Sequence, residues 1–246
     1  MRPHERIFVA LDTPDPSRAH HLARVLTGRV GGLKIGLEAF VSGGPSLVCA
    51  LRDAGHSIFL DLKLHDIPNT VGGAARAAAR LGVSFLTVHA LGGSEMIARA
   101  VEACAAQAPA GAPPTCVLAV TILTSHDDAS LARIGIAGPS AVAVPRLAAL
   151  AREAGAGGIV CSPLEIEQAR RSHPVGVLVV PGIRPRVAGG RAADDQARVA
   201  TAAEAVRAGA DRIVVGRPIV DAPDPVAAAE SIADDIARNA GARAGS

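Results

Sequence analysis

Eight short runs typical of β-strands recur along the chain, and a segment of helix-forming composition follows each of them. The strand-like runs lie at 6–12, 31–37, 57–63, 85–90, 116–123, 157–162, 176–182 and 211–216. The helical segments lie at 16–26, 42–54, 70–81, 94–107, 139–155, 163–171, 201–209 and 224–239. A spacing of about 31 residues matches one strand–helix unit of a parallel sheet. The alternation therefore predicts an α/β fold, a closed (β/α)8 or TIM barrel.

An open, doubly wound sheet is the alternative interpretation of the same alternation. Its dinucleotide-binding form carries Gly-x-Gly-x-x-Gly after the first strand, and no such motif follows residues 6–12. No linker of biased composition divides the chain, so we predict a single domain over residues 1–246, with a frayed tail at 241–246. The connections 124–138 and 183–201 are longer than ordinary turns and follow strands, which predicts lids or ligand contacts.

The composition argues against several classes of function. The formal net charge is +2, aromatic residues make up 2%, and basic residues form no block, so we expect no nucleic-acid partner. The longest apolar runs are too short to span a membrane, and the N-terminus leads into a strand without the apolar core of a signal peptide. The four cysteines lack metal-ligand spacing and are read as small buried hydrophobic residues. We expect a cytoplasmic enzyme or binding protein.

The stretch 61–70, Asp-Leu-Lys-Leu-His-Asp-Ile-Pro-Asn-Thr, carries a strand-like run into a group of charged residues. Asp61 and Lys63 lie two positions apart, so on a strand their side chains point to the same face. Pro68 cannot continue a sheet ladder, which places Asp66 on the turn that leaves the strand. An acid–base pair inside a sheet is costly to bury, so this stretch indicates a functional site.

Lysine is rare in this chain. Lysine and arginine together number 25, and only Lys34 and Lys63 are lysines. Both lie in strand-like runs. A lysine ammonium can donate a proton, whereas the arginine guanidinium stays protonated in proteins, so the distribution favours a chemical role for both lysines. Chance survival in an arginine-biased sequence is the alternative.

The ends of the first three strand-like runs carry ionisable residues. Asp12 ends the first run, Lys34 lies in the second, and Asp61 and Lys63 lie in the third. In a barrel, the carboxyl ends of the strands converge on one mouth, where active sites of this architecture lie. The sequence therefore predicts four ionisable groups around one space. Ordinary structural salt bridges are the alternative explanation.

A phosphate site is predicted at the last two strands. Gly216 and Arg217 follow the eighth run, Arg184 follows the seventh, and Gln196 lies in the long connection after it. Loops after strands seven and eight form the common phosphate site of these barrels, and glycine lets the backbone approach an anion closely. The alternative is that Gly216-Arg217-Pro218 is only a tight turn with Arg217 on the surface.

The carboxylates could instead be ligands of Mg²⁺, which prefers oxygen donors. Lys63 lies between Asp61 and Asp66, however, and Lys34 is expected nearby, so the acidic groups already have fixed counter-charges. We therefore predict no metal at these carboxylates. His89, at the end of the fourth run, is a possible ligand or base, although a single histidine in that place is more often a hydrogen-bonded part of the barrel wall.

The stretch 61–70 resembles the Asp-x-Lys-x-x-Asp-Ile-x-Asn-Thr signature of the orotidine 5′-phosphate decarboxylase family. The resemblance extends along the chain through Val-Ala-Leu-Asp12, Leu-Lys34-Ile-Gly, Pro-Gly-Ile-Arg184, Asp-Gln196 and Val-Gly216-Arg217-Pro. The Asp-x-Lys-x-x-Asp core is shared with Mg²⁺-dependent sugar-phosphate decarboxylases and synthases, whereas the Ile-x-Asn-Thr extension and Lys34 favour the orotidine enzymes. A non-catalytic barrel that binds a phosphate ligand is a third alternative.

The resemblance implies a homodimeric barrel that decarboxylates orotidine 5′-monophosphate to UMP, the last step of de novo pyrimidine biosynthesis, without a cofactor or metal. It implies that Lys34, Asp61, Lys63 and Asp66 form the charged catalytic group. Lys63 would protonate C6 of the pyrimidine, and Asp61 would crowd the substrate carboxylate.

The resemblance also implies the residues that bind the substrate. Asp66 and Thr70 would reach into the active site of the partner subunit. Asp12 would hold the ribose hydroxyls, and Thr124 would contact the pyrimidine. The phosphate would be bound by four residues: Arg184, Gln196, Gly216 and Arg217.

Overall fold

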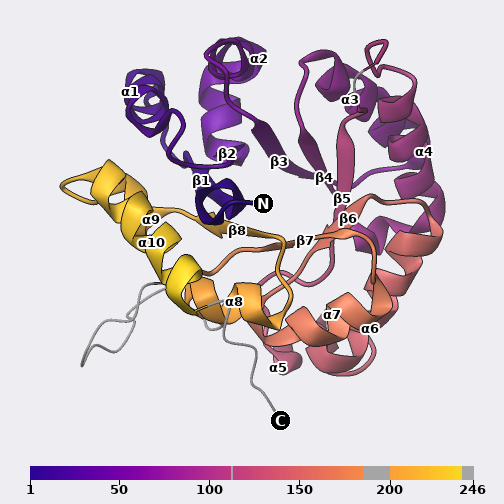
Figure 1. The fold of residues 1–246 in the computed structure, drawn as a ribbon. Helices are drawn as coiled ribbons and strands as arrows, with labels where there is room; N and C mark the ends of the chain where they lie inside the picture. Colours follow the sequence, from indigo (N-terminus) through magenta and orange to yellow (C-terminus); the bar gives the residue numbers. More distant parts are fainter. Residues whose placement is uncertain (112, 185–199, 240–246) are drawn as a thin grey trace.

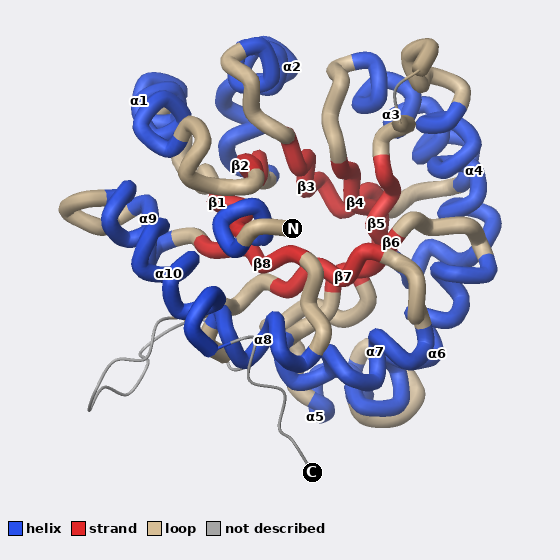
Figure 2. The backbone as a smooth tube through the Cα atoms, viewed as in Figure 1, coloured by secondary structure: helices blue, strands red, loops and turns tan. Residues whose placement is uncertain are grey.

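The computed structural model describes residues 1–111, 113–184 and 200–239 and shows a closed barrel (Figures 1 and 2). Within these ranges, eight parallel strands pair in chain order, and β8 closes the barrel against β1. The strands are β1 Ile7–Ala10, β2 Gly32–Ile35, β3 Ile58–Leu64, β4 Phe85–His89, β5 Cys116–Val120, β6 Gly158–Val160, β7 Val177–Val180 and β8 Arg212–Val215. The predicted barrel fold is confirmed, and the predicted frayed tail lies outside the described residues.

Helices surround the strands, as the blue outer layer around the red barrel in Figure 2 shows. They are α1 Pro16–Leu26, α2 Leu37–Asp53, α3 Pro68–Arg80, α4 Gly93–Ala105, α5 Asp128–Arg133, α6 Ser140–Glu153, α7 Ile166–Ser172, α8 Ala202–Ala208, α9 Arg217–Val220 and α10 Pro225–Asn239. Short 3-10 turns are η1 Pro3–Arg6, η2 Ala90–Gly92 and η3 Pro163–Glu165. No helix in the described ranges combines the length and apolar composition needed to cross a bilayer.

Local sequence explains where several of these helices begin. At α1, Asp15 accepts a hydrogen bond from the backbone N–H of Ser17 at 2.8 Å, and Pro16 occupies the first helical position. At α8, the Thr201 hydroxyl accepts from the Glu204 N–H while the Glu204 carboxylate accepts from the Thr201 N–H, which forms a capping box. These contacts satisfy backbone donors that have no partner inside a helix. The predicted bounds of α1 match those observed.

The helices differ from the predicted segments in two places. Helix α2 begins at Leu37 rather than at residue 42, because the segment before Gly44 is already helical and buries Ala39 completely. Gly44 adopts φ 59°, which bends the chain and joins two helical segments into one element. Helix α5, which was not predicted, lies inside the connection 124–138, and Asp127 caps it by accepting the Ser130 N–H at 2.7 Å.

The strands separate an inner apolar cluster from an outer one, because successive side chains point to opposite faces. The inner cluster comprises Phe8, Ala10, Phe59, Leu118, Val120, Val160, Val179 and Val214. Phe8, Phe59 and Phe85 make edge-on contacts with ring centroids 5.6 to 6.2 Å apart. Phe8 and Phe85 belong to the beginnings of their strands, so their two rings fill the amino-terminal half of the barrel, and Phe59 lines the space above them. Open space for a ligand is therefore left at the carboxyl-terminal mouth.

Candidate active site

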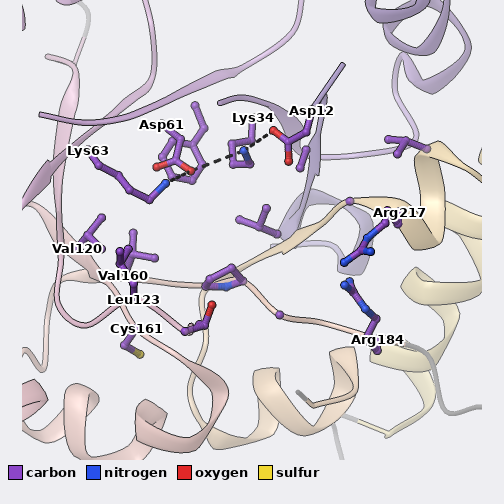
Figure 3. Close-up of a pocket in the computed structure, with 18 of the residues that line it drawn as sticks. Asp12, Lys34, Asp61, Lys63, Val120, Leu123, Val160, Cys161, Arg184 and Arg217 are labelled. Carbon is purple, nitrogen blue, oxygen red and sulfur yellow. Dashed lines mark hydrogen bonds and ion pairs between the residues drawn. The ribbon is translucent and has the colours of Figure 1, made fainter. Parts of the chain in front are cut away.

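A pocket of about 440 Å³ opens at the carboxyl-terminal mouth of the barrel, a volume typical of small-molecule sites. Figure 3 shows charged side chains from the first three strands on one side of it. Two arginines from the ends of the last two strands lie on another side. An apolar wall of Val120, Leu123 and Val160 completes the lining. Such a pocket suits a ligand with an anionic group at one end and a flat, partly apolar ring at the other.

Four side chains form a continuous series of alternating charge in this pocket. The Lys63 ammonium donates a hydrogen bond to Asp61 Oδ2 at 2.9 Å, and the Lys34 ammonium lies 3.6 Å from the same oxygen. Lys34 also donates to Asp12 Oδ1 at 2.9 Å. The structure thus brings together the four ionisable residues that sequence reasoning placed at the strand ends.

Asp61 is the buried centre of this series, with 8% of its surface exposed. Burial alone would raise the pKa of Asp61, but the nearby ammonium groups of Lys34 and Lys63 and the hydrogen bonds from Lys63 and Thr87 hold it below its ordinary value. The carboxylate is therefore charged at neutral pH. A fixed negative charge keeps both lysine ammoniums aimed into the pocket.

Asp61 and Lys63 owe their positions to an irregularity in β3. Leu60 pairs with Leu86 on β4, but the next pair is Leu64 with Val88, so β3 contains extra residues between the two pairs. Lys63 has φ 50°, the only positive φ of a non-glycine residue in the described part of the chain. Such a conformation is costly for a lysine and is typical of functional sites.

Gly36, the residue before α2, leaves room for the Asp12–Lys34 pair. A Cβ atom at this position would lie 2.7 Å from Asp12 Oδ1 and 2.8 Å from Lys34 Nζ. Both distances are too short for ordinary contact, so any side chain here would displace the pair. Sequence reasoning noted this glycine only within the Leu-Lys-Ile-Gly motif.

Asp66 and Thr70 lie apart from this pocket. Asp66 is exposed on the turn after β3, where its carboxylate accepts the Ile67 N–H at 2.6 Å, and Thr70 is exposed in the first turn of α3. Neither is among the described residues that line the pocket. Ile67, between them, is 66% exposed. The predicted role of both residues in a partner's site stays a prediction.

The candidate phosphate ligands are brought together in part. Arg184, Gly216 and Arg217 line the pocket, and in Figure 3 the two arginine side chains point toward each other. Thr124 also lines the pocket, on the side of the apolar wall. Gln196 lies outside the described residues.

His89 ends β4 and is not among the described residues that line the pocket. Its ring stacks on His65 with centroids 5.4 Å apart, and its Nδ1 accepts the Leu91 N–H at 3.4 Å. Burial lowers the pKa of His89 to about 4, helped by the positive potential of His65, Lys63 and His126. The imidazole is therefore neutral at neutral pH. Within the described residues, no group of three or more histidine, cysteine or acidic side chains is arranged to hold a metal ion.

Comparison with known proteins assigns the chain to a family. The sequence profile of the orotidine 5′-phosphate decarboxylase / HUMPS family matches residues 5–232, nearly the whole chain. The chain belongs to this family.

Relatives named orotidine 5′-phosphate decarboxylase match along almost their whole length. The chain is 57% identical to the one from Anaeromyxobacter sp. (strain K) over 234 residues, which cover 95% of this chain and 99% of the relative. It is 52% identical to the one from Halorhodospira halophila, with 94% of this chain and 96% of the relative covered.

Solved structures show the same likeness. The crystal structure of orotidine 5′-phosphate decarboxylase from Lactobacillus acidophilus superimposes with a TM-score of 0.82 at 40% identity, and the match covers 94% of this chain and 98% of that one. A conserved protein from Geobacillus kaustophilus, described as uncharacterized, gives a TM-score of 0.81 at 34% identity, with 94% and 99% covered.

Thr87 is a residue of this decarboxylase-family site that sequence reasoning did not single out. It is fully buried in β4, and its hydroxyl contacts both Asp61 and the backbone of Lys63. Its position near the end of a strand-like run, directly before Val88 and His89, could have indicated that it lies close to the mouth of the barrel. Nothing in the sequence, however, reveals which residue of β3 would lie opposite it.

Proposed function

We propose that this protein removes the carboxylate of orotidine 5′-monophosphate as CO₂ and yields UMP, the last step of de novo pyrimidine biosynthesis. The observation that carries the proposal is the series Asp12–Lys34–Asp61–Lys63 at the mouth of the barrel, opposite Arg184 and Arg217. This arrangement occurs in a chain of the orotidine 5′-phosphate decarboxylase / HUMPS family. Its relatives at 47–57% identity are named for the same activity.

The chemistry requires that negative charge be stabilised on a ring carbon. When the bond between C6 and the carboxylate breaks, CO₂ departs and the electron pair remains on C6, where no conjugated group accepts it. The Lys63 ammonium stabilises that charge and then transfers a proton from Nζ to C6, which completes UMP. Fixed charge in a site that excludes water acts most strongly where charge develops in the transition state.

Asp61 and Lys34 have supporting roles in this proposal. The Asp61 carboxylate would face the substrate carboxylate, so their repulsion is relieved when CO₂ leaves. Lys34 lies 3.6 Å from Asp61 and 2.9 Å from Asp12, so it holds both acids in a fixed array. Fixed partners need no rearrangement during the reaction.

The remaining contacts bind parts of the substrate that do not react. Asp12 is proposed to hold the ribose hydroxyls, and Thr124 the pyrimidine. Arg184, Arg217, Gly216 and Gln196 are proposed to bind the phosphate, for which arginine offers paired donors. Binding energy from a remote phosphate can hold the reacting ring against the charged array.

A homodimer is part of the proposal. Asp66 and Thr70 are exposed on a single chain, and Ile67 between them is 66% exposed. Leu91, after the neighbouring strand β4, is 41% exposed. Exposed apolar side chains next to Asp66 and Thr70, which do not line the pocket of their own chain, are suited to contact with a second copy of the chain.

The shared site is tested by mixing variants. Chains carrying Lys63→Ala and chains carrying Asp66→Ala are each expected to be inactive, but a heterodimer regains one complete site. Recovery of activity after subunit exchange supports the shared site. If exchange is demonstrated and activity does not return, Asp66 acts within its own chain or has no role. The proposed cytoplasmic location is tested by cell fractionation.

The main test is an absorbance assay with orotidine 5′-monophosphate in the presence of EDTA. We expect turnover to continue with the chelator, whereas the alternative, a Mg²⁺-dependent sugar-phosphate decarboxylase or synthase, would lose its activity. Lys63→Ala should reduce turnover by about four powers of ten, because a unit charge about 3 Å from the developing anion contributes about 5–6 kcal/mol at an effective dielectric constant of about 20.

The variant should still bind UMP, which controls for folding. Retained turnover in Lys63→Ala would remove Lys63 from the mechanism. If the unmodified protein binds UMP tightly but releases no CO₂, the chain is a non-catalytic phosphate-binding barrel instead.

A further inference from the structure

The strand that carries the catalytic pair departs from regular pairing with β4. From Leu60 to Leu64 the chain advances four residues, while its partner advances only two, from Leu86 to Val88. Asp61 and Lys63 lie inside this irregular segment, and Lys63 has the left-handed φ of 50°. A side chain of this size does not adopt that conformation unless surrounding contacts hold it.

Thr87 fills the gap in the pairing. It lies between Leu86 and Val88 on β4 and has no exposed surface. Its hydroxyl accepts the backbone N–H of Lys63 at 2.9 Å and donates to Asp61 Oδ1 at 2.9 Å. The Thr87 hydroxyl oxygen therefore replaces the backbone carbonyl that would accept the Lys63 N–H in regular strand pairing. The hydroxyl proton points to the Asp61 carboxylate.

The second contact determines how Asp61 is oriented. With Oδ1 accepting from Thr87, Oδ2 remains for Lys63 at 2.9 Å and Lys34 at 3.6 Å. Without the hydroxyl, the partly buried Lys63 N–H would lose its acceptor and the Asp61 carboxylate could rotate. Losing a hydrogen bond to a charged group is costly, and so is leaving a partly buried donor without an acceptor.

We propose that Thr87 is a positioning residue for the decarboxylation: its hydroxyl holds the Asp61 carboxylate and the Lys63 backbone so that the Lys63 ammonium faces the reacting carbon. This inference rests on the proposed function. Thr87 does not touch the substrate in this assignment, because it is buried behind Asp61. It acts through the two residues that it holds.

The test replaces the hydroxyl without changing the size of the side chain. Thr87→Val should lower kcat for orotidine 5′-monophosphate by about 10- to 100-fold, the effect expected for a hydrogen bond to a charged group. The KM and the affinity for UMP should change by less than about threefold, because the phosphate and ribose contacts remain. Thr87→Ser, which restores the hydroxyl, should keep kcat within about threefold of the unmodified enzyme.

Thr121 provides a matched control. It is also fully buried, and its hydroxyl donates to a backbone carbonyl, that of Val160, at 3.0 Å. Thr121→Val loses a comparable buried hydrogen bond that does not touch the charged series. It should reduce the free energy of unfolding as Thr87→Val does but should leave kcat nearly unchanged.

If the unmodified protein decarboxylates orotidine 5′-monophosphate, any of three results would refute the proposed role of Thr87. They are an active Thr87→Val variant, a Thr87→Ser variant as impaired as Thr87→Val, or an equal loss of kcat in Thr121→Val. If Thr87→Val does not fold, Thr87→Cys is tested instead, because a thiol is only a weak hydrogen-bond donor. Full activity of Thr87→Cys would also refute the proposal. An unmodified protein that does not decarboxylate orotidine 5′-monophosphate would instead refute the proposed function, and this inference with it.

Discussion

Asp61→Asn should destabilise the protein in a way that depends on pH. The substitution keeps the shape of the side chain and removes a charge that lies 2.9 Å from the Lys63 ammonium and 3.6 Å from that of Lys34. At an effective dielectric constant of about 20, these separations correspond to about 6 and about 5 kcal/mol of gross attraction. The cost of burying Asp61 offsets much of this attraction.

The net loss in the free energy of unfolding should be about 2–3 kcal/mol, below the usual cost of breaking a buried ion pair. Two features of the site reduce it. The Lys63 side chain is 32% exposed and can regain water, and Lys34 keeps its partner Asp12. The amide of the new asparagine can still accept the hydrogen bond from Thr87.

The sign of the pH dependence follows from the lowered pKa of Asp61. A carboxyl group whose folded-state pKa is depressed adds stability above its unfolded pKa, here an ordinary value of 3.8, and loses it as the pH falls through the folded-state pKa. The difference between the unmodified protein and Asp61→Asn should therefore stay constant down to about pH 5 and shrink below it. At still lower pH, both proteins carry an uncharged side chain.

The assay is urea unfolding followed by far-ultraviolet circular dichroism across this pH range, because the chain has no tryptophan or tyrosine to serve as a fluorescence probe. Measurements at two protein concentrations separate subunit dissociation from unfolding. Asp53→Asn is the control, since its pair with Arg52 is on the surface and should contribute less than about 1 kcal/mol. A variant as stable as the unmodified protein, or a difference that does not shrink in acid, would refute the reasoning.

Two further substitutions test the two ends of the pocket. Gly36→Ala places a Cβ within 2.8 Å of Asp12 Oδ1 and Lys34 Nζ, so the pair must shift. We expect kcat/KM to fall about tenfold because the charged pair is displaced. The free energy of unfolding should change by less than about 1 kcal/mol, because the flexible ends of these side chains can move aside. An unchanged kcat/KM would show that the added methyl group does not displace the pair. Arg217→Ala should lower kcat/KM for orotidine 5′-monophosphate by about 100-fold, as expected when a charge-assisted contact to phosphate is lost. Steady-state kinetics with orotidine, which has no phosphate, should show almost no effect, and an equal loss with both substrates would contradict the phosphate role.

The alternation of strand-like and helical runs in the sequence was enough to predict the barrel. Parallel strands connected by helices of this length leave few ways to bury both faces of a sheet, and the eight repeats match a closed barrel. Helix α1 was predicted from composition, and its start is explained by Asp15 and Pro16, which act locally. Residues at strand ends such as Asp12 and Lys34 could be assigned to one mouth, because the carboxyl ends of parallel strands share one side of the fold.

Tertiary structure alone decided how those residues meet. Thr87 lies 26 residues from Asp61 in the chain, and their contact depends on the irregular register between β3 and β4. The positive φ of Lys63 and the close approach of Gly36 to Lys34 likewise depend on neighbouring strands. Local sequence encodes helix starts, strand periodicity and turn residues, because these depend on nearby atoms. The register between strands depends on the packing of the whole barrel, so the orientation of the charged side chains in the pocket could be known only from the folded chain.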